Sequence, residues 1–422
     1  MQIAVIGAGY VGLVQAAGLA HLGHTISLAD ASSERLDALG AGKLPVYEPG
    51  LSEMFGRAVS HGLIHFHDDN ISAVRDAEVV FLTLPTPPDA DGRADVSAVM
   101  SVVREIGPHV GSAVIATKST VPTGTAVQIR DLLSEIGSAA GVVSNPEFLA
   151  EGNAVEDFMR AERIVIGAFD AADADRVAAV YRGLVAEIIL MDPLSAELTK
   201  YGANAFLAAR LTFANALSNL AEELGADVLP ILEAIGLDRR IGPHFLRPGP
   251  GYGGSCFPKD TSALLRIADD AGYEFGMLRS VIETDELQRE RIVAKCVDLL
   301  GGDIAGKRIA LWGLAFKAGT DDTRESPALK VGTALMDAGA LVTAYDPEAT
   351  AAGIPTAASA LEAAVDAELL IVGTEWPAFL RVTPLALAAV MRGHVVYDLR
   401  NLLDQVALRQ AGFRYLGVGR PE

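Results

Sequence analysis

The sequence predicts an α/β protein with two sheet-containing domains and a helical segment between them. Short apolar segments alternate with segments of helical spacing at both ends of the chain, and residues 195–225 have the pattern of one long helix. The N-terminal order of strand, loop, helix, strand and Asp recurs after residue 303. Strands that alternate with helices form parallel sheets covered by helices. We therefore expect three domains, at 1–194, 195–302 and 303–422.

The N-terminal domain begins with a strand candidate at residues 2–7, which is short, β-branched and ended by glycine. The helix over 195–225 contains no proline and, before its end, only Gly202. A long helix that is apolar around much of its circumference usually crosses a molecule or lines a subunit interface. The remaining expected elements are strands at 25–29, 79–84, 113–117, 142–144, 308–312, 341–345, 368–373 and 394–397, a helix from the glycine turn to about residue 21, and a helix at 327–338.

The composition of the 422 residues excludes several classes of protein. Half of them are hydrophobic, which excludes wholesale disorder, and a net charge of −20 disfavours nucleic acid as a partner. Two cysteines cannot form a disulfide framework, so we expect a reducing cytoplasm. The apolar N-terminus lacks the charged start of a signal peptide, and no stretch of 18 apolar residues predicts a membrane span.

The segment Gly7-Ala-Gly9-Tyr-Val-Gly12 is typical of a dinucleotide-binding turn. It follows a strand, opens a helix, and is followed by Asp30 at the end of the next strand. The glycines allow a tight turn, approach of a pyrophosphate and close helix packing, and Asp30 would accept hydrogen bonds from the adenosine ribose. Asp30 favours NAD over NADP, whereas Arg35 nearby weakens that preference. A glycine turn that serves only packing is the structural alternative.

Two pairs of polar residues lie where chemistry is expected. Glu147 and Glu151 share a helical spacing directly after a strand, and Lys200 and Asn204 are one turn apart on the long helix. The first pair follows a strand end, and ligands of open α/β sheets bind at strand ends. The second pair, a lysine and an asparagine, can orient a water molecule or stabilise an oxyanion. The alternatives are a solvated acidic face for the first pair and a surface-covering lysine beside a packing asparagine for the second.

The two cysteines have different surroundings. Cys296 lies in an apolar helical stripe and is expected to fill the core. Cys256 lies in the polar loop PGYGGSCFPKD, where glycines let a ligand approach the backbone and Lys259 favours a thiolate. Cys256 is therefore a candidate nucleophile.

Taken in this order, the motifs resemble those of the nucleotide-sugar 6-dehydrogenases, the UDP-glucose/GDP-mannose dehydrogenase family, over essentially the whole chain. The resemblance rests on IAVIGAGYVGL, LPVYEPGL (44–51), KSTVP (118–122), NPEFLAEG (145–152), KYGANAFLA (200–208), the cysteine loop and LAFKAGTDDTRESP (314–327). It implies an N-terminal Rossmann-type NAD domain, a central long-helix domain that carries the dimer contact, and a C-terminal Rossmann-like domain that binds the nucleotide sugar.

The resemblance also implies a four-electron oxidation of the sugar C6 from alcohol to acid with two NAD. An aldehyde gives up a hydride only after a nucleophile adds to it, and the Cys256 thiolate would form a thiohemiacetal and then a thioester that water hydrolyses. GYGGSCFPKD is more similar to family members that act on UDP-glucose than to those that act on GDP-mannose. The implied reaction is UDP-glucose + 2 NAD + H2O → UDP-glucuronate + 2 NADH.

Site residues follow from the resemblance, motif by motif, and no metal is implied. The implied catalytic residues are Cys256, Lys200, Asn204, Asp260, Thr120, Glu147 and Glu151. The implied NAD contacts are Gly7, Gly9, Tyr10, Val11, Gly12, Asp30, Arg35, Pro85, Thr86, Thr120, Glu151, Lys259 and Arg324. The implied substrate contacts are Glu147, Phe148, Leu149, Ala150, Glu151, Lys200, Asn204, Arg240, Phe245, Leu246, Arg247, Pro248, Gly249, Tyr252, Gly253, Lys317 and Arg400. Arg240 matches a family arginine that reaches the neighbouring subunit's nucleotide, which implies a homodimer built on the long helix.

Three other functions remain as alternatives. A GDP-mannose 6-dehydrogenase would use the same chemistry on another base. A two-electron hydroxyacid dehydrogenase would combine a Rossmann domain, a long helix and a Lys-x-x-x-Asn pair, but it needs no loop cysteine. A nucleotide-sugar-binding regulator without turnover would not need Cys256, Lys200, Asn204 and Asp260 together.

Overall fold

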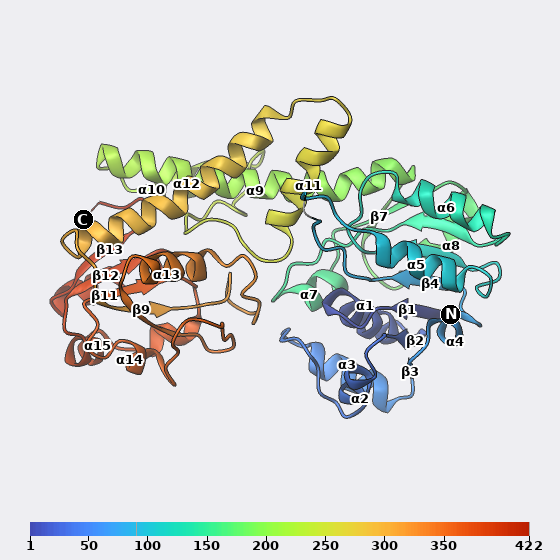
Figure 1. The fold of residues 1–422 in the computed structure, drawn as a ribbon, viewed down its shortest axis with the longest axis horizontal. Helices are drawn as coiled ribbons and strands as arrows, with labels where there is room; N and C mark the ends of the chain where they lie inside the picture. The colour runs from blue at the N-terminus through green and yellow to red at the C-terminus, as the bar shows by residue number, and fades with distance from the viewer. Residues whose placement is uncertain (90, 422) are drawn as a thin grey trace. The chain divides into compact units, whose positions relative to one another are not determined.

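A computed structural model describes residues 1–89 and 91–421, which divide into two compact units. The first unit is Met1–Ala203 together with Ser262–Gly272, and the second is Asn204–Thr261 together with Tyr273–Glu422. Each unit has its own sheet (Figure 1). The division into three domains at residues 194 and 302 stays a prediction.

The sheet of the first unit has the strand order β3-β2-β1-β4-β5-β6-β7-β8. Its strands are β1 (Gln2–Ile6), β2 (Thr25–Ala29), β3 (Ile64–His67), β4 (Val79–Leu82), β5 (Val114–Thr117), β6 (Gly141–Ser144), β7 (Arg163–Ala168) and β8 (Glu187–Met191). Five of them match predicted strands, whereas β3, β7 and β8 were not predicted. The β6–β7 pair is antiparallel, which departs from the parallel order expected of the whole sheet.

Alternate residues of the central strands in this sheet pack on opposite faces. In β1, Ile3 and Val5 join one buried cluster, and Ala4 and Ile6 join another. Helices α1 (Tyr10–His21), α2 (Ser33–Gly40), α3 (Leu51–Ser60), α7 (Ala154–Met159) and α8 (Ala171–Val180) pack in the first cluster. Helices α4 (Asn70–Val74), α5 (Ser97–Ile106) and α6 (Thr125–Glu135) pack in the second. Because both faces of the central strands are covered, a strand such as β4 (VVFL) is continuously apolar in sequence.

The long helix α9 runs from Pro193 to Leu224, within two residues of the predicted bounds (Figure 1). Its residues up to Ala203 belong to the first unit, and the rest belong to the second. The other helices of the middle of the chain are α10 (Val228–Gly236), α11 (Phe257–Asp270) and α12 (Gly276–Leu299).

The sheet of the second unit is parallel, with the order β10-β9-β11-β12-β13. Its strands are β9 (Arg308–Trp312), β10 (Leu341–Tyr345), β11 (Leu369–Val372), β12 (Val395–Asp398) and β13 (Arg414–Gly417), of which only β13 was not predicted. Its helices are α13 (Pro327–Asp337), α14 (Ala360–Ala363), η1 (Pro377–Arg381), α15 (Pro384–Val390) and α16 (Gln405–Gln410). The predicted α/β fold is confirmed.

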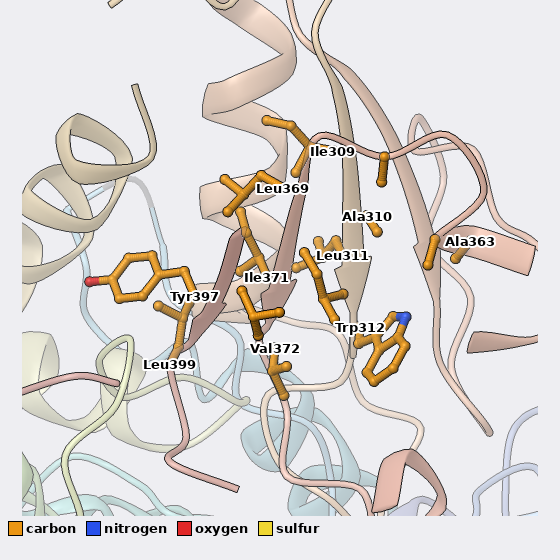
Figure 2. Packing of buried hydrophobic residues seen from close by; sticks show 14 of the residues in the cluster. Ile309, Ala310, Leu311, Trp312, Ala363, Leu369, Ile371, Val372, Tyr397 and Leu399 are labelled. Carbon is orange, nitrogen blue, oxygen red and sulfur yellow. The ribbon is translucent and has the colours of Figure 1, made fainter. Parts of the chain in front are cut away.

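The core of the second unit packs side chains from neighbouring strands against one another (Figure 2). The indole of Trp312 is buried, and its Nε1–H donates to the carbonyl of Ala360 at 2.8 Å. Cys296 of α12 is fully buried in the same cluster, which confirms its predicted place in the core. Burial raises the pKa of the Cys296 thiol to about 12, so this sulfur is inert at neutral pH.

Each sheet has a point at which the strand order reverses, between β1 and β4 in the first unit and between β9 and β11 in the second. Ligands of open α/β sheets bind beyond the carboxyl ends of the strands at such points. The predicted glycine turn follows β1, Pro85 and Thr86 follow β4, and Lys317 and Arg324 follow β9. Within residues 1–89 and 91–421, no helix has both the length and the apolar character to cross a bilayer.

Candidate active site

The glycine turn lies between the end of β1 and the start of α1. Gly7 has a φ of +105°, and a Cβ on Gly12 would lie 1.9 Å from the Gly7 carbonyl oxygen, so neither position accepts a side chain. At Gly9, by contrast, a Cβ would meet no protein atom within 4 Å. The turn therefore leaves open space at the N-terminus of α1, next to half-buried Tyr10 and Val11.

Asp30 lies beside this turn, directly after β2. Its carboxylate accepts hydrogen bonds from the backbone N–H of Ala8 at 2.8 Å and of Ser32 at 2.9 Å. Arg35 adds an ion pair at 2.9 Å, with the Asp30 side chain 9 % exposed and the Arg35 side chain 41 % exposed. The structure thus brings the predicted ribose-binding carboxylate and the predicted glycine turn together, with Arg35 partly balancing the charge of Asp30.

The loops after β4 and β5 are joined to each other. The Thr86 hydroxyl donates to the Thr120 carbonyl at 2.9 Å. Pro85 is exposed and Thr120 is half-buried. The strand β4 is next to β1, and β5 is next to β4, all parallel. The loops leave the carboxyl ends of these strands, so the predicted cofactor residues lie at the same edge of the sheet as the glycine turn.

Glu147 and Lys200 form a buried ion pair in the first unit. Lys200 Nζ lies 3.0 Å from Glu147 Oε1, with the side chains 3 % and 7 % exposed. The ring of Phe148 lies 5.5 Å from the same ammonium group. Glu147 also accepts a hydrogen bond from the backbone N–H of Leu149, which fixes the start of the segment Phe148–Glu151. A paired carboxylate and ammonium of this kind can exchange a proton with a bound substrate or water.

Lys118 is a buried residue of this region to which the sequence analysis gave no role. Its Nζ donates to Asn145 Oδ1 and to the Tyr181 hydroxyl, each at 3.2 Å. Burial lowers the pKa of Lys118 to about 7; the charge of Glu147 opposes this shift, and that of Lys200 adds to it. Its signal in the sequence was the motif KSTVP, but a single lysine gives no sign of burial without the fold around it.

A second cluster of predicted catalytic residues lies in the second unit. Asn204 Nδ2 donates to Asp260 Oδ2 at 2.6 Å, and Lys259 Nζ donates to Asp260 Oδ1 at 2.6 Å. The Asp260 side chain is almost completely buried. Both of its oxygens are thus bound by predicted site residues. Lys200 and Asn204 are one turn apart on α9.

Cys256 directly precedes α11 and is half-buried. Its carbonyl accepts the backbone N–H of Asp260 at 2.8 Å, and its Sγ lies 3.5 Å from the Ser255 hydroxyl. The prediction of a loop was therefore wrong for the residues after the cysteine, which form the first turn of the 14-residue helix α11. The partial positive charge of a helix N-terminus favours a thiolate over a thiol.

The glycines before Cys256 pack against the loop between β9 and α13. A Cβ on Gly253 would lie 2.4 Å from the Glu325 carbonyl oxygen, and one on Gly254 would lie 2.9 Å from the Phe316 ring. The Gly254 N–H donates to the Arg324 carbonyl at 3.0 Å. This contact brings the cysteine segment next to the loop that carries Lys317 and Arg324.

The predicted substrate segment 245–249 is held by side-chain amides. The Gly249 N–H donates to Asn215 Oδ1 at 2.8 Å, and Gln288 Nε2 donates to the Gly249 carbonyl at 3.0 Å. Phe245 has a φ of +57°, which is uncommon for a residue other than glycine. Within the segment and just after it, Leu246, Pro248 and Tyr252 are buried, whereas Arg247 is exposed.

Arg400 lies at the end of β12, close to this segment. Its Nε donates to the Gly373 carbonyl at 2.9 Å, and its Nη2 donates to the Phe316 carbonyl at 2.8 Å. A Cβ on Gly249 would lie 3.1 Å from its Nη1. The structure thus brings Gly249 and Arg400 together, whereas Arg240 is on the surface, 81 % exposed and paired with Asp238.

Comparison with protein families gives three matches in order along the chain. Residues 1–185 match the NAD binding domain of the UDP-glucose/GDP-mannose dehydrogenase family, residues 194–286 its central domain, and residues 310–405 its UDP binding domain. The chain belongs to the UDP-glucose/GDP-mannose dehydrogenase family. The predicted resemblance is confirmed, and the chain is an NAD-linked oxidoreductase of this family whose substrate class is a UDP-sugar.

Individual relatives in the UDP-glucose/GDP-mannose dehydrogenase family extend over the full chain. The chain is 42 % identical to UDP-glucose 6-dehydrogenase of Rhizobium meliloti, with all of both chains covered. It is 39 % identical to UDP-glucose 6-dehydrogenase TuaD of Bacillus subtilis, over 100 % of this chain and 93 % of that one. Among solved structures, a UDP-glucose dehydrogenase from Pyrobaculum islandicum superimposes with a TM-score of 0.92 at 37 % identity, over 99 % and 97 % of the two chains.

The residues present fit NAD. The open space over Gly9, the amides at the start of α1 and the carboxylate of Asp30 are the features that a dinucleotide needs in this fold. The roles assigned to individual site residues stay predictions.

Proposed function

We propose that this dehydrogenase oxidises UDP-glucose at C6 to UDP-glucuronate with two NAD and one water. The named relatives support UDP-glucose as the sugar nucleotide. The observation that carries the four-electron reaction is the half-buried Cys256 at the start of α11, four residues before buried Asp260. A two-electron dehydrogenase has no use for a nucleophile at this position.

NAD, when bound, accepts the two electrons of each oxidation step as a hydride. We assign its binding to the glycine turn, Asp30 and the loops carrying Thr86 and Thr120. In the first step the C6 alcohol loses a hydride and a proton and becomes an aldehyde. The ion pair of Glu147 and Lys200 is buried, and such a pair can hold the released proton.

The second oxidation requires Cys256. Its thiolate adds to the aldehyde carbon, which forms a C–S bond and a thiohemiacetal. Loss of the hydrogen on that carbon as a hydride, together with the hydroxyl proton, gives a thioester. The glycines before Cys256 and the helix after it fix the sulfur, and the helix N-terminus favours the thiolate at the start of this step.

Hydrolysis of the thioester regenerates the thiol. Asp260, with one oxygen bound by Asn204 and the other by Lys259, is the carboxylate proposed to orient the attacking water. Lys200 and Asn204 are proposed to stabilise the oxyanion that forms on the sugar carbon, with Thr120 and Glu147 assisting. Water supplies the second carboxylate oxygen, and the C–S bond breaks.

The nucleotide end of the substrate is proposed to bind at the carboxyl ends of the second sheet. Arg400, which is paired with Glu375 at 3.0 Å, and Lys317 are proposed to bind the diphosphate, and the Gly249 segment supplies backbone groups next to Arg400. Guanidinium and ammonium groups at a strand edge are typical diphosphate ligands.

We also propose that the enzyme is a cytoplasmic homodimer built on α9. Phe206, Phe213 and Leu220 recur every seven residues on this helix and are 61, 55 and 53 % exposed. Apolar side chains with a seven-residue spacing share a helix face and favour a helical partner. Arg240, whose side chain is 81 % exposed, is the residue proposed to reach the nucleotide of the second copy.

The function is tested by initial rates with a panel of nucleotide sugars and by the number of NADH molecules formed per product. We expect UDP-glucose to have the highest kcat/KM and two NADH for each UDP-glucuronate. A higher kcat/KM for GDP-mannose than for UDP-glucose would show that the substrate assignment is wrong. One NADH per product would show that the enzyme carries out a two-electron oxidation.

A further inference from the structure

The motif LPVYEPGL has no role in the reaction described above, yet it contains a deeply buried carboxylate. Glu48 is 6 % exposed and lies between α2 and α3. Its side chain binds two segments of the first unit, one 38 residues away in sequence and the other 104 to 106 residues away.

The first of these segments is the turn that carries Glu151. Glu48 Oε2 accepts the backbone N–H of Gly152 at 2.6 Å, and Glu48 Oε1 accepts that of Ala154 at 2.8 Å. On the other side of Glu151, the backbone N–H of Ala150 donates to Asp157 Oδ2 at 2.8 Å. Buried or half-buried carboxylates therefore hold the peptide groups on both sides of Glu151.

The second segment is the start of α1. The hydroxyl of Tyr10, the first residue of α1 and the neighbour of Gly9, donates to Glu48 Oε2. The Gly152 N–H also lies 3.2 Å from the Tyr10 oxygen. Burial and the contact with Glu48 raise the pKa of Tyr10, so its hydroxyl keeps its proton and donates at every working pH. One oxygen of Glu48 thus serves both the glycine turn and the Glu151 turn.

We propose that Glu48 is a positioning residue that fixes the backbone of the catalytic residue Glu151 relative to the glycine turn of the NAD site. This inference rests on the proposed function and on the predicted role of Glu151 as a contact of both NAD and the sugar nucleotide. A carboxylate is needed because it can accept several hydrogen bonds and offers no donor. A glutamine in its place would turn an N–H toward a backbone N–H or toward the Tyr10 hydroxyl.

The test compares Glu48→Gln, Tyr10→Phe and the double variant with the wild type. We expect Glu48→Gln to lower kcat at saturating substrates at least tenfold, while the Kd for NAD alone changes less than threefold because Gly9 and Asp30 are intact. Tyr10→Phe should lower kcat less. The double variant should lose no more than Glu48→Gln alone, because both residues act through one carboxylate oxygen.

Tyr415→Phe is a matched control. Its hydroxyl donates to the buried carboxylate of Asp398 at 3.0 Å, which is the same type of contact in the second unit. Its kcat should stay within twofold of the wild type even if its Tm falls. If Glu48→Gln also loses only Tm, with kcat per folded enzyme within twofold, Glu48 is merely structural and the proposal is wrong. If the losses of kcat were additive in the double variant, Glu48 and Tyr10 would not act through the same carboxylate oxygen.

Hydrogen exchange tests the positioning without any substrate. Amides of residues 149–155 should exchange at least tenfold faster in Glu48→Gln, while those of β1 and β4 are unchanged. Unchanged exchange at 149–155 would overturn the proposal even if kcat falls. A wild type that does not oxidise UDP-glucose would instead refute the proposed function, and the exchange result would still decide the role of Glu48.

Discussion

Lys118 is a lysine in the interior whose Nζ is held by two neutral oxygens, of Asn145 and Tyr181. The carboxylate of Glu147 contributes to its electrostatic surroundings, but it is already paired with Lys200. A buried ammonium without its own counter-ion costs stability, and the pKa of about 7 reflects that cost.

This cost predicts a pH dependence of stability. Between pH 7 and the ordinary lysine pKa near 10.5, the folded chain binds fewer protons at Lys118 than the unfolded chain does, so stability rises with pH. Lys118→Met should raise the free energy of unfolding by about 2–4 kcal/mol at pH 6–7 and flatten its rise up to pH 9.5. Urea denaturation at several pH values measures this, with exposed Lys43→Met as the control. An unchanged pH slope in Lys118→Met would contradict the assignment.

The contact between Asp30 and Arg35 predicts how cofactor preference changes. The wild type should prefer NAD over NADP at least about tenfold in kcat/KM, because a 2′-phosphate beside Asp30 is repelled. Asp30→Ser should lower the ratio of kcat/KM for NAD to kcat/KM for NADP. Arg35→Ala should raise this ratio, because the guanidinium 2.9 Å from Asp30 no longer balances the charge of the carboxylate. Equal kcat/KM for the two cofactors in the wild type, or no change in Asp30→Ser, would show that Asp30 does not select the cofactor.

At the site, the sequence could identify residues whose motif carries a known chemistry, but not residues that act through long-range contacts. Cys256, Lys200 and Asn204 stand out by residue type and spacing. Lys118 and Glu48 do not, because their burial depends on partners up to 106 residues away in sequence. Lys118 lies in the motif KSTVP and Glu48 in the motif LPVYEPGL. The sequence therefore marked both segments, but it did not show which contacts make these two residues important.

At the scale of elements, we expect different effects on stability from two glycine substitutions in the turn before α1. Gly12→Ala places a methyl group 1.9 Å from the Gly7 carbonyl oxygen and should destabilise the fold and abolish NAD binding. Gly9→Ala meets no protein atom within 4 Å, so it should fold with a Tm close to the wild type and still bind NAD at least tenfold more weakly. Calorimetric titration and thermal melting measure both. Gly40→Ala, at the end of α2 with open space around it, is the control. If Gly9→Ala bound NAD as tightly as the wild type, NAD would not bind at this turn.

The exposed apolar row on α9 makes the prediction about assembly. Phe213→Asp puts a charge in the middle of the row and should convert a dimer to monomers at micromolar protein in sedimentation velocity. Leu385→Asp on α15, which is 75 % exposed, should leave the dimer intact. A wild type that sediments as a monomer would contradict a dimer built on α9.

Periodicity predicted the long helix and the apolar strands well, and strands with polar residues poorly. The 32-residue helix α9 was found within two residues because its apolar pattern runs without a break, and β9 and β10 were found at their bounds. The missed strands β3 (IHFH) and β13 (RYLG) lie at sheet edges and contain polar residues, so neither has a continuous apolar run. Equally short strands with an apolar run, such as β4 (VVFL), were predicted. β7 pairs antiparallel with β6, and the direction of a strand is decided by tertiary pairing that a local pattern does not record.

At the scale of the whole molecule, the sequence predicted the fold class because strand–helix alternation occurs twice. It could not predict that residues 262–272 pack in the first unit while the residues on either side belong to the second. That division of the middle segment follows from contacts between distant parts of the chain. Each unit carries one of the two clusters to which the proposed reaction is assigned, Glu147–Lys200 in the first and Cys256 with Asp260 in the second.

The central claim is that Cys256 becomes covalently attached to the sugar, and mass spectrometry of Cys256→Ser tests it most directly. The serine hydroxyl can attack the aldehyde, but its ester hydrolyses far more slowly than a thioester, so the intermediate should accumulate. After incubation with UDP-glucose and NAD, we expect an added UDP-sugar acid on the peptide that contains residue 256, and none without NAD. Cys256→Ala should show no adduct and no UDP-glucuronate, and Cys296→Ala should keep its activity. Full kcat in Cys256→Ala, with no adduct in Cys256→Ser, would contradict the account.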